Sequence, residues 1–138
     1  MEFDLIISNG SLINGSCFQR KDIGVTNGII SVLAKPGQLE KKMAKREIDA
    51  TGKLIIPGVI DSHVHMREPG FTTKEDFSTG TKAAAAGGVT TVMVMPFNQP
   101  FTFSDKELEE KARIADGKAV VDFVLQAAVD PFSLTDIK

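Results

Sequence analysis

The second part of the chain alternates between apolar runs and amphipathic segments, and this alternation limits the fold more than any other feature. Three apolar runs, which we expect to form buried strands, cover residues 54–60, 89–95 and 119–129. Between them lie two segments with helical spacing, 72–87 and 104–117. Continuous apolar strands that alternate with helices are typical of parallel βαβ units. The pattern therefore predicts an α/β fold with a parallel sheet.

Both predicted helices have recognisable ends and residues at helical spacing. The spacings of Thr72 with Glu75 and of Ser104 with Glu107 predict capping boxes at their first turns. On the first helix, one face gathers Phe77, Gly80, Thr81 and Ala84. On the second, the residues at helical spacing are Leu108, Lys111, Ala112 and Ala115. Because residues three and four apart are neighbours on a helix and the first face carries small residues, we expect the first helix to lie close against a sheet.

The first part of the chain has the pattern of a small β-sandwich or part of one, with short strands and frequent turns. We expect a strand over 3–7 that ends in a turn at Asn9-Gly10. A hairpin should turn at Asn27-Gly28, since this dipeptide supplies the positive φ angles of a two-residue turn. A further hairpin over 46–56 would turn at 50–53.

Composition excludes several classes of function. With 42% hydrophobic and 25% charged residues, the chain of 138 residues has the profile of a soluble globular protein. Its net charge of −2 gives no electrostatic reason to expect a nucleic-acid or membrane partner. The single cysteine, Cys17, excludes an internal disulfide, and no apolar stretch approaches the ~20 residues that span a bilayer. We expect a cytoplasmic protein.

Four functional side chains alternate directly after the first apolar run of the α/β part: Asp61, His63, His65 and Arg67. Alternate residues of a strand share a face, so these four side chains should point the same way. Two imidazoles, a carboxylate and a guanidinium are costly to bury for packing alone. Two imidazoles side by side can bind one metal ion, and these histidines are the only two in the chain. The pattern indicates a metal site with a cationic substrate contact beside it.

A bare His-x-His pair is more often structural, but its position favours the metal interpretation. His63 and His65 lie at the carboxyl end of a predicted parallel strand, where α/β folds gather their chemistry. Arg67 is placed to hold a substrate carboxylate, although an ion pair with Asp61 or Glu68 is an equal alternative. Asp61 is more suited to orient a histidine or the following loop than to bind metal.

Asn98 follows the second predicted strand and is a further candidate. It is placed like a polar group at the mouth of a barrel, where it would contact substrate. The alternative is a turn-forming asparagine, which is common in loops. Gly87-Gly88 is better explained as a helix end than as a phosphate-binding loop, because no glycine-rich nucleotide motif is present.

The motifs resemble the amidohydrolase superfamily, in its cyclic-amidase branch of dihydroorotases, allantoinases and hydantoinases. The segments that carry the resemblance are 57–70, 79–91, Met95-Pro96 and the opening strand 3–10. The resemblance extends over essentially the whole chain. It implies part of a β-sandwich over 1–55, followed over 56–138 by the first three β/α units of an incomplete TIM-type (β/α)8 barrel. A homo-oligomer, or association through the exposed sheet, is also expected.

The resemblance implies specific roles for the candidate residues. His63 and His65 would bind the more buried of two metal ions, usually zinc. Arg67 matches the dihydroorotase pattern, in which this arginine contacts the substrate carboxylate, and Asn98 would be a second substrate-binding residue. The metal ions would polarise the ring amide and activate water, so the expected substrate is a small cyclic amide.

Two departures limit what the resemblance implies. Phe97 stands where dihydroorotases usually have asparagine, and 95–100 looks more like allantoinases, whereas Arg67 and 74–77 favour dihydroorotase. We expect a dihydroorotase-like enzyme, with allantoinase or another cyclic amidase as the alternative.

The family's bridging lysine, further histidines and general-base aspartate would come from later strands, and Lys138 lies too near the end to be assigned. The 138-residue chain alone is therefore expected to be inactive. A non-catalytic module that acts in assembly or regulation is the alternative of another class.

Overall fold

The computed structural model describes residues 3–129, without the side chains of Asn14 and Lys42. The chain divides into two compact units, Met1–Pro57 and Gly58–Lys138. The division falls two residues after the boundary that we expected between 55 and 56. In the described part of the chain, no helix has the length and apolar character needed to cross a membrane.

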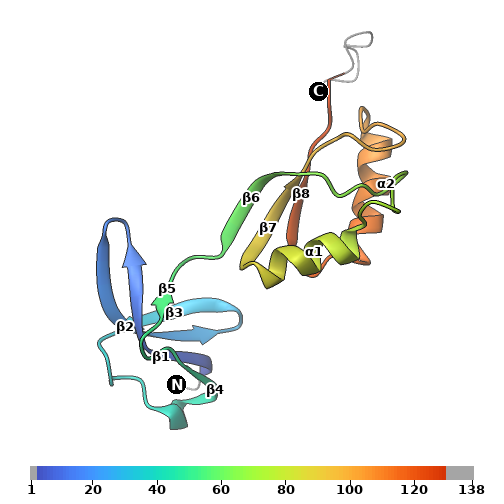
Figure 1. The fold of residues 1–138 in the computed structure, drawn as a ribbon. Coiled ribbons are helices and arrows are strands. Elements are labelled where there is room, and N and C mark those ends of the chain that lie inside the picture. The colour runs from blue at the N-terminus through green and yellow to red at the C-terminus, as the bar shows by residue number, and fades with distance from the viewer. Residues whose placement is uncertain (1–2, 130–138) are drawn as a thin grey trace. The chain divides into compact units, whose positions relative to one another are not determined.

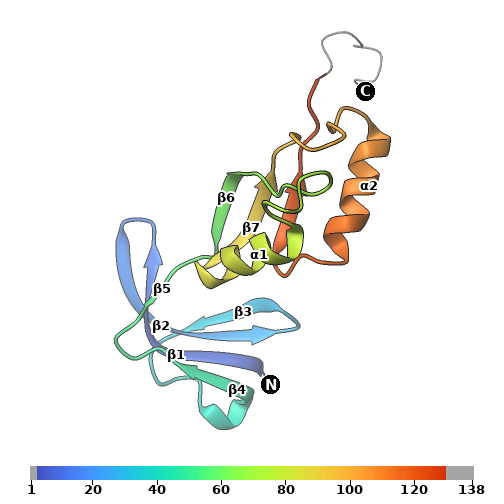
Figure 2. The ribbon, with the colours of Figure 1, turned by 45° about the vertical axis from the view of Figure 1, so that its right-hand side comes forward.

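The first unit is one five-stranded sheet in which β1 is the central strand (Figures 1 and 2). The strands are β1 (Phe3–Asn14), β2 (Cys17–Thr26), β3 (Ile29–Ala34), β4 (Ala44–Asp49) and β5 (Leu54–Ile55), with a short 3-10 turn at Lys41–Met43. Their order is β3-β2-β1-β4, and β5 also pairs with β1. Its buried apolar side chains are Phe3, Ile6, Ile23 and Ala50.

The hairpin predicted at Asn27-Gly28 is confirmed. Thr26 pairs with Ile29 across a two-residue turn. Asn27 and Gly28 both have positive φ angles, 52° and 75°. These are the angles that the turn requires, and asparagine and glycine adopt them at the least cost.

The turn predicted at Asn9-Gly10 is wrong, because β1 continues through it. The register of β1 against β2 shifts between Ile7 and Gly10, which makes this site a β-bulge. Asn9 has a φ of 63°, and its backbone N–H donates to Asp22 Oδ1 at 3.0 Å. A side chain from the neighbouring strand therefore holds the extra residue in place.

The hairpin predicted over 46–56 is also wrong. The chain does turn after β4, where Lys53 N donates to the Ala50 carbonyl at 2.9 Å. The strands β4 and β5 do not pair with each other, however, because both run parallel to β1. With twelve residues, β1 is long enough to pair with the two in succession.

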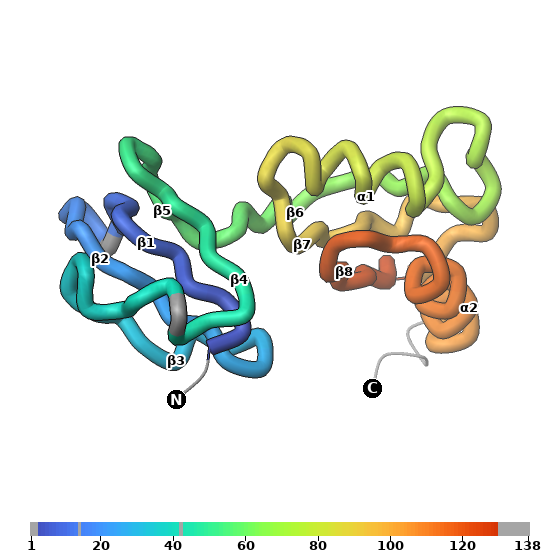
Figure 3. The backbone as a smooth tube through the Cα atoms, turned by 90° about the horizontal axis from the view of Figure 1, so that it is seen from below, coloured from blue at the N-terminus to red at the C-terminus, as the bar shows by residue number. Residues whose placement is uncertain are grey.

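The second unit is a three-stranded parallel sheet with two helices, as the alternation predicted. Its elements are β6 (Val59–Val64), α1 (Phe77–Ala86), β7 (Val89–Val94), α2 (Asp105–Asp116) and β8 (Asp122–Leu125). The order is β6-β7-β8, with both strand pairs parallel. Because βαβ crossovers are right-handed, consecutive strands place both helices on one face of the sheet (Figure 3).

The core of this unit lies between that face and the helices. It consists of Met66, Phe77, Val92, Val94 and Ala115. The predicted face of α1 is confirmed, since Phe77, Gly80 and Thr81 are buried and Ala84 packs against the core.

Two of the predicted strands differ from the observed ones. The chain is not a strand at 56–58, and β6 begins only at Val59. The strand is exposed rather than buried, with 63% of Ile60 accessible, and among the described residues β6 lies at the edge of the sheet. The third strand is shorter than 119–129 and covers only Asp122–Leu125.

Capping residues mark the ends of both helices. The capping box of Ser104 with Glu107 is confirmed at α2, and Gly87 and Gly117 are the C-caps of α1 and α2. The box predicted at Thr72 is wrong, because α1 begins five residues later with Asp76 as its N-cap. Thr79 N donates to Asp76 Oδ1 at 2.7 Å, and this bond fixes the first turn.

Thr81 joins α1 to the segment that enters β8. Its hydroxyl donates to the Phe77 carbonyl at 2.5 Å and accepts from Val120 N at 3.1 Å, and the side chain is fully buried. We expect Thr81→Val to lower the free energy of unfolding of this unit by about 1–3 kcal/mol, because Val120 N loses its acceptor. Chemical denaturation measures the loss, and hydrogen exchange over 118–122 locates it.

Thr81→Ser is the matched control, since it removes a methyl group but keeps the hydroxyl. Hydrogen exchange of the backbone amides over 118–122 should be faster than in the wild type in the Thr81→Val variant only. Equal acceleration in both variants would contradict the assigned role of the hydroxyl.

Candidate metal and substrate site

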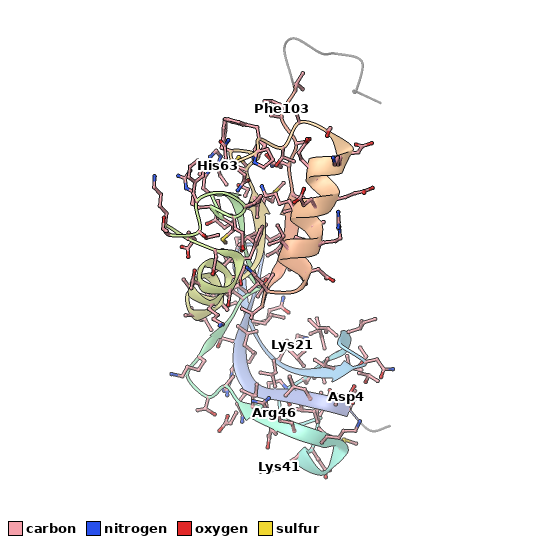
Figure 4. All side chains as sticks on the ribbon, turned by 90° about the vertical axis from the view of Figure 1, so that its right-hand side faces the viewer. Asp4, Lys21, Lys41, Arg46, His63 and Phe103 are labelled. Atoms are coloured by element: carbon pink, nitrogen blue, oxygen red, sulfur yellow. The ribbon has the colours of Figure 1, made fainter. Side chains whose placement is uncertain are left out.

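The candidate residues lie at the carboxyl end of β6 and in the loop that follows. Val64 and Met66 pack against the core under the helices. Side chains alternate along an extended chain, so His63 and His65 face the opposite side of the sheet. Figure 4 shows His63 toward the same end of this unit as Phe103. The alternation separates the packed core from the polar site.

The two imidazoles lie side by side. Their ring centroids are 5.3 Å apart, with the rings inclined at 68°. His63 is exposed and His65 is half-buried. Rings at this separation can bind one ion between them, since metal–imidazole bonds are ~2.0–2.1 Å long.

His65 has the properties of a metal ligand. Its Nδ1 is buried and has no hydrogen-bond partner within the described residues. Burial, followed by the positive charges of Arg67, His63 and Lys111, lowers the pKa of His65 below 6.5. The imidazole is therefore neutral at pH 7, which is the form that binds metal. Across the described residues, no cluster of three or more histidine, cysteine, aspartate or glutamate side chains completes such a site.

Asp61 contacts the histidine strand through the backbone. Its Oδ1 accepts from His63 N at 3.1 Å. This bond stabilises the end of β6, where the pairing with β7 becomes irregular between Asp61 and Val64. The contact involves the backbone of His63 and not its ring.

Arg67 is half-buried and forms neither of the ion pairs that we considered for it. Glu68 pairs with Lys118 instead, and its other oxygen accepts from Phe77 N at 3.2 Å. Asp61 is engaged with the His63 backbone. Over residues 3–129, no ion pair of Arg67 is therefore seen, and its positive charge is left for another group.

Asn98 is buried beneath the loop that carries Arg67, with only 1% of its surface exposed. Its Nδ2 donates to the carbonyls of Met66 at 3.0 Å and Glu68 at 2.9 Å, which flank Arg67. Its Oδ1 accepts from Lys111 Nζ at 2.5 Å. Asn98 thus holds the loop, and a contact with substrate stays a prediction.

Lys111 also contributes to the site, although its sequence pattern predicted no function for it. It comes from α2, is 1% exposed and also donates to the Met95 carbonyl at 2.8 Å. Burial lowers its pKa from 10.5 to about 8. A lysine within an otherwise apolar helix face was the signal, but its partners could not be inferred from the helix alone.

The loops after β6 and β7 are in direct contact. Gln99 N donates to the Pro69 carbonyl at 3.2 Å. Gly70 has a φ of 101°, and a Cβ there would lie 2.6 Å from the Gln99 carbonyl oxygen. The glycine at the end of the histidine motif is therefore required by this close approach.

An exposed series of aromatic rings extends from His65. The ring centroids are 5.9 Å apart from His65 to Phe97, 5.6 Å from Phe97 to Phe101 and 5.5 Å from Phe101 to Phe103. Phe97 is 51% exposed. The polar candidates thus have an apolar surface beside them.

Known proteins match both the sequence and the fold. The family model for dihydro-orotase-like proteins matches residues 52–130. An allantoinase of Rubrobacter xylanophilus is 42% identical over 94% of this chain. The L-hydantoinase of Arthrobacter aurescens superposes with a TM-score of 0.90 over 97% of the chain at 32% identity. An N-acyl-D-glutamate deacylase of Bordetella bronchiseptica, solved with zinc and a phosphonate inhibitor, matches 68% of the chain with a TM-score of 0.53 at 30% identity.

The matches cover most of this chain but a small share of each relative. The chain spans 28% of the allantoinase, 30% of the hydantoinase and 19% of the deacylase. The predicted fold class is confirmed, with strands followed by the first β/α units of an amidohydrolase barrel. From the family model and this similarity together, the chain belongs to the dihydro-orotase-like family, within the cyclic-amidase branch of the amidohydrolases.

Proposed function

We propose that the protein is a metal-dependent hydrolase of a cyclic amide and that residues 1–138 form one wall of its active site. The observation that carries the proposal is the pair of adjacent imidazoles, His63 and His65, followed by the guanidinium of Arg67, for which no ion pair is seen among the described residues. The allantoinase and hydantoinase relatives support the same reaction class.

His63 and His65 would hold the metal ion, for which we propose zinc. Burial keeps His65 neutral at pH 7, so no proton has to leave its ring before it binds. The zinc-bound deacylase relative supports this choice of metal. When bound, the ion supplies Lewis-acid chemistry and lowers the pKa of water towards ~7.

Arg67 would orient the ring by contacting an anionic or strongly polar substituent. A guanidinium binds a carboxylate through two parallel hydrogen bonds, which fixes direction as well as distance. Among cyclic amides, this favours dihydroorotate, which carries a carboxylate. Allantoin is the second candidate, favoured by the 42% identity to an allantoinase.

We also propose that residues 1–138 alone bind zinc weakly and open no ring. The chain contains two histidines, and zinc in a catalytic site takes three protein ligands. The exposed strand β6 should also promote self-association of this piece, because unpaired strand edges are templates for pairing. Stoichiometric zinc in a stable monomer of 1–138 would contradict both statements.

The reaction class is tested with the full-length gene product on dihydroorotate, allantoin and hydantoin. We expect ring opening of at least one, loss of activity with a chelator, and recovery with added zinc. His63→Ala and His65→Ala should each lower the bound zinc and abolish turnover, because the metal loses a ligand. Arg113→Ala, on the exposed side of α2, is the control and should retain both the bound zinc and the turnover. Activity that survives complete removal of metal would contradict the proposal.

The role of Arg67 is tested with two rings that differ only in the carboxylate, dihydroorotate and dihydrouracil. If dihydroorotate is the substrate, Arg67→Gln should raise its KM by about 10- to 100-fold, because a charge-assisted hydrogen bond contributes about 1.5–3 kcal/mol. Turnover of dihydrouracil should change little.

The measurement is KM and kcat for both rings, with zinc content determined in parallel. An equal rise in KM for dihydroorotate and dihydrouracil would mean that Arg67 does not contact the carboxylate. A preference for allantoin in the wild type would select the second candidate.

A further inference from the structure

A buried ammonium group lies directly beneath the candidate site. Lys111 is 1% exposed, and its Nζ has two acceptors, the Met95 carbonyl at 2.8 Å and Asn98 Oδ1 at 2.5 Å. Both acceptors are neutral, and no ion pair of Lys111 is seen in the described part of the chain. Burying a charge without a counter-charge is costly, so the position calls for a reason beyond packing.

The contact with Lys111 decides which way the Asn98 carboxamide faces. A lysine ammonium can only donate, so the oxygen of the carboxamide must face it. The Nδ2 group is then directed to the carbonyls of Met66 and Glu68, at 3.0 and 2.9 Å. If the Asn98 carboxamide were rotated by 180°, Nδ2 would face the ammonium, donor against donor. Oδ1 would then face two carbonyl oxygens, acceptor against acceptor, and both contacts would be unfavourable.

The carbonyls that Asn98 binds belong to the residues immediately before and after Arg67. Other bonds also hold this segment: Met95 N donates to the Val64 carbonyl at 2.9 Å, and Phe71 N donates to the Arg67 carbonyl at 2.8 Å. The Glu68 side chain accepts from Phe77 N at 3.2 Å and pairs with Lys118. Lys111 itself binds the Met95 carbonyl at the end of β7. The Asn98 carboxamide thus connects the backbone on both sides of Arg67 to Lys111 of α2.

We propose that Lys111 is a positioning residue, which acts through Asn98 to fix the backbone on both sides of Arg67 and thereby places the guanidinium for the substrate. The inference rests on the proposed function, in which Arg67 orients the ring. Small displacements of such a group matter, because a misplacement of about 1 Å can cost about 100-fold in rate.

The test is Lys111→Met in the full-length gene product, since methionine fills a similar volume without a donor. We expect KM for the ring substrate to rise by about 10-fold or more, as expected for loss of a positioned charged contact, with zinc content unchanged. Lys106→Met, an exposed lysine on the same helix, is the matched control and should leave KM unchanged.

A double-mutant cycle separates positioning from general stability. If Lys111 acts through Arg67, then Lys111→Met should change KM by less than about 2-fold in the Arg67→Gln background. Hydrogen exchange should accelerate over 66–71 in Lys111→Met and stay unchanged in the first unit. Independent, multiplicative effects of the two substitutions on KM would overturn the inference, as would an unchanged KM in Lys111→Met.

Asn98→Asp tests the same connection if Lys111→Met does not fold. Aspartate keeps an oxygen for Lys111 but removes the donors to the two carbonyls, so it should reproduce the rise in KM. A normal KM in this variant would also overturn the inference. A wild-type protein that opens none of the rings would overturn the proposed function itself, and the assigned role of Lys111 with it.

Discussion

The carboxamide of Asn98 connects three elements of the second unit, and the geometry of the candidate site depends on it. Its two ends bind the loop after β6 and the lysine of α2, while its own backbone lies in the loop after β7. The parallel register of β6 and β7, with Val64 opposite Val94, brings the two loops to the same edge of the sheet. Parallel pairing therefore brings the loops after β6 and β7 close together, and the buried Asn98 amide fixes the distance between them.

The same strand contributes to the core and to the site without conflict, because its side chains alternate. Val64 and Met66 stabilise the packing under the helices, whereas His63 and His65 face away from it. Half-burial of His65 then has a chemical consequence, since it lowers the pKa and keeps the imidazole neutral. Lys111 and Arg67 add positive charge nearby, which acts in the same direction. The neutral imidazole is the form that binds metal, and the positive charges beside it suit an anionic group on the substrate.

The elements that sequence predicted correctly are those specified by neighbouring residues. The turn at Asn27-Gly28 needs only two positive φ angles, and the start of α2 needs only Ser104 and Glu107. Two of the predictions that were wrong, the turn at Asn9-Gly10 and the hairpin over 46–56, depend on distant partners. The bulge at Asn9 is held by Asp22, and β4 and β5 share β1 in a way that no local pattern specifies.

In the candidate site, too, the features predicted correctly are local, and those left open depend on distant residues. His63 and His65 lie side by side as their spacing predicted, because strand alternation is a local property. The partners of Arg67 and Asn98 were left open by the sequence. The Arg67 alternative depended on Glu68, which pairs with Lys118, 50 residues away, and Asn98 binds a carbonyl 32 residues away. Lys111 was included among the residues at helical spacing, but the role proposed for it depends on the contact with Asn98, 13 residues before it.

The central claim is that His63 and His65 together bind a metal ion in the active protein. Anomalous X-ray diffraction at the zinc edge, on crystals of the full-length gene product, tests it directly. We predict an anomalous peak ~2.0–2.1 Å from one ring nitrogen of each histidine. A zinc peak elsewhere, with the His65 nitrogen hydrogen-bonded inside the protein, would contradict the claim.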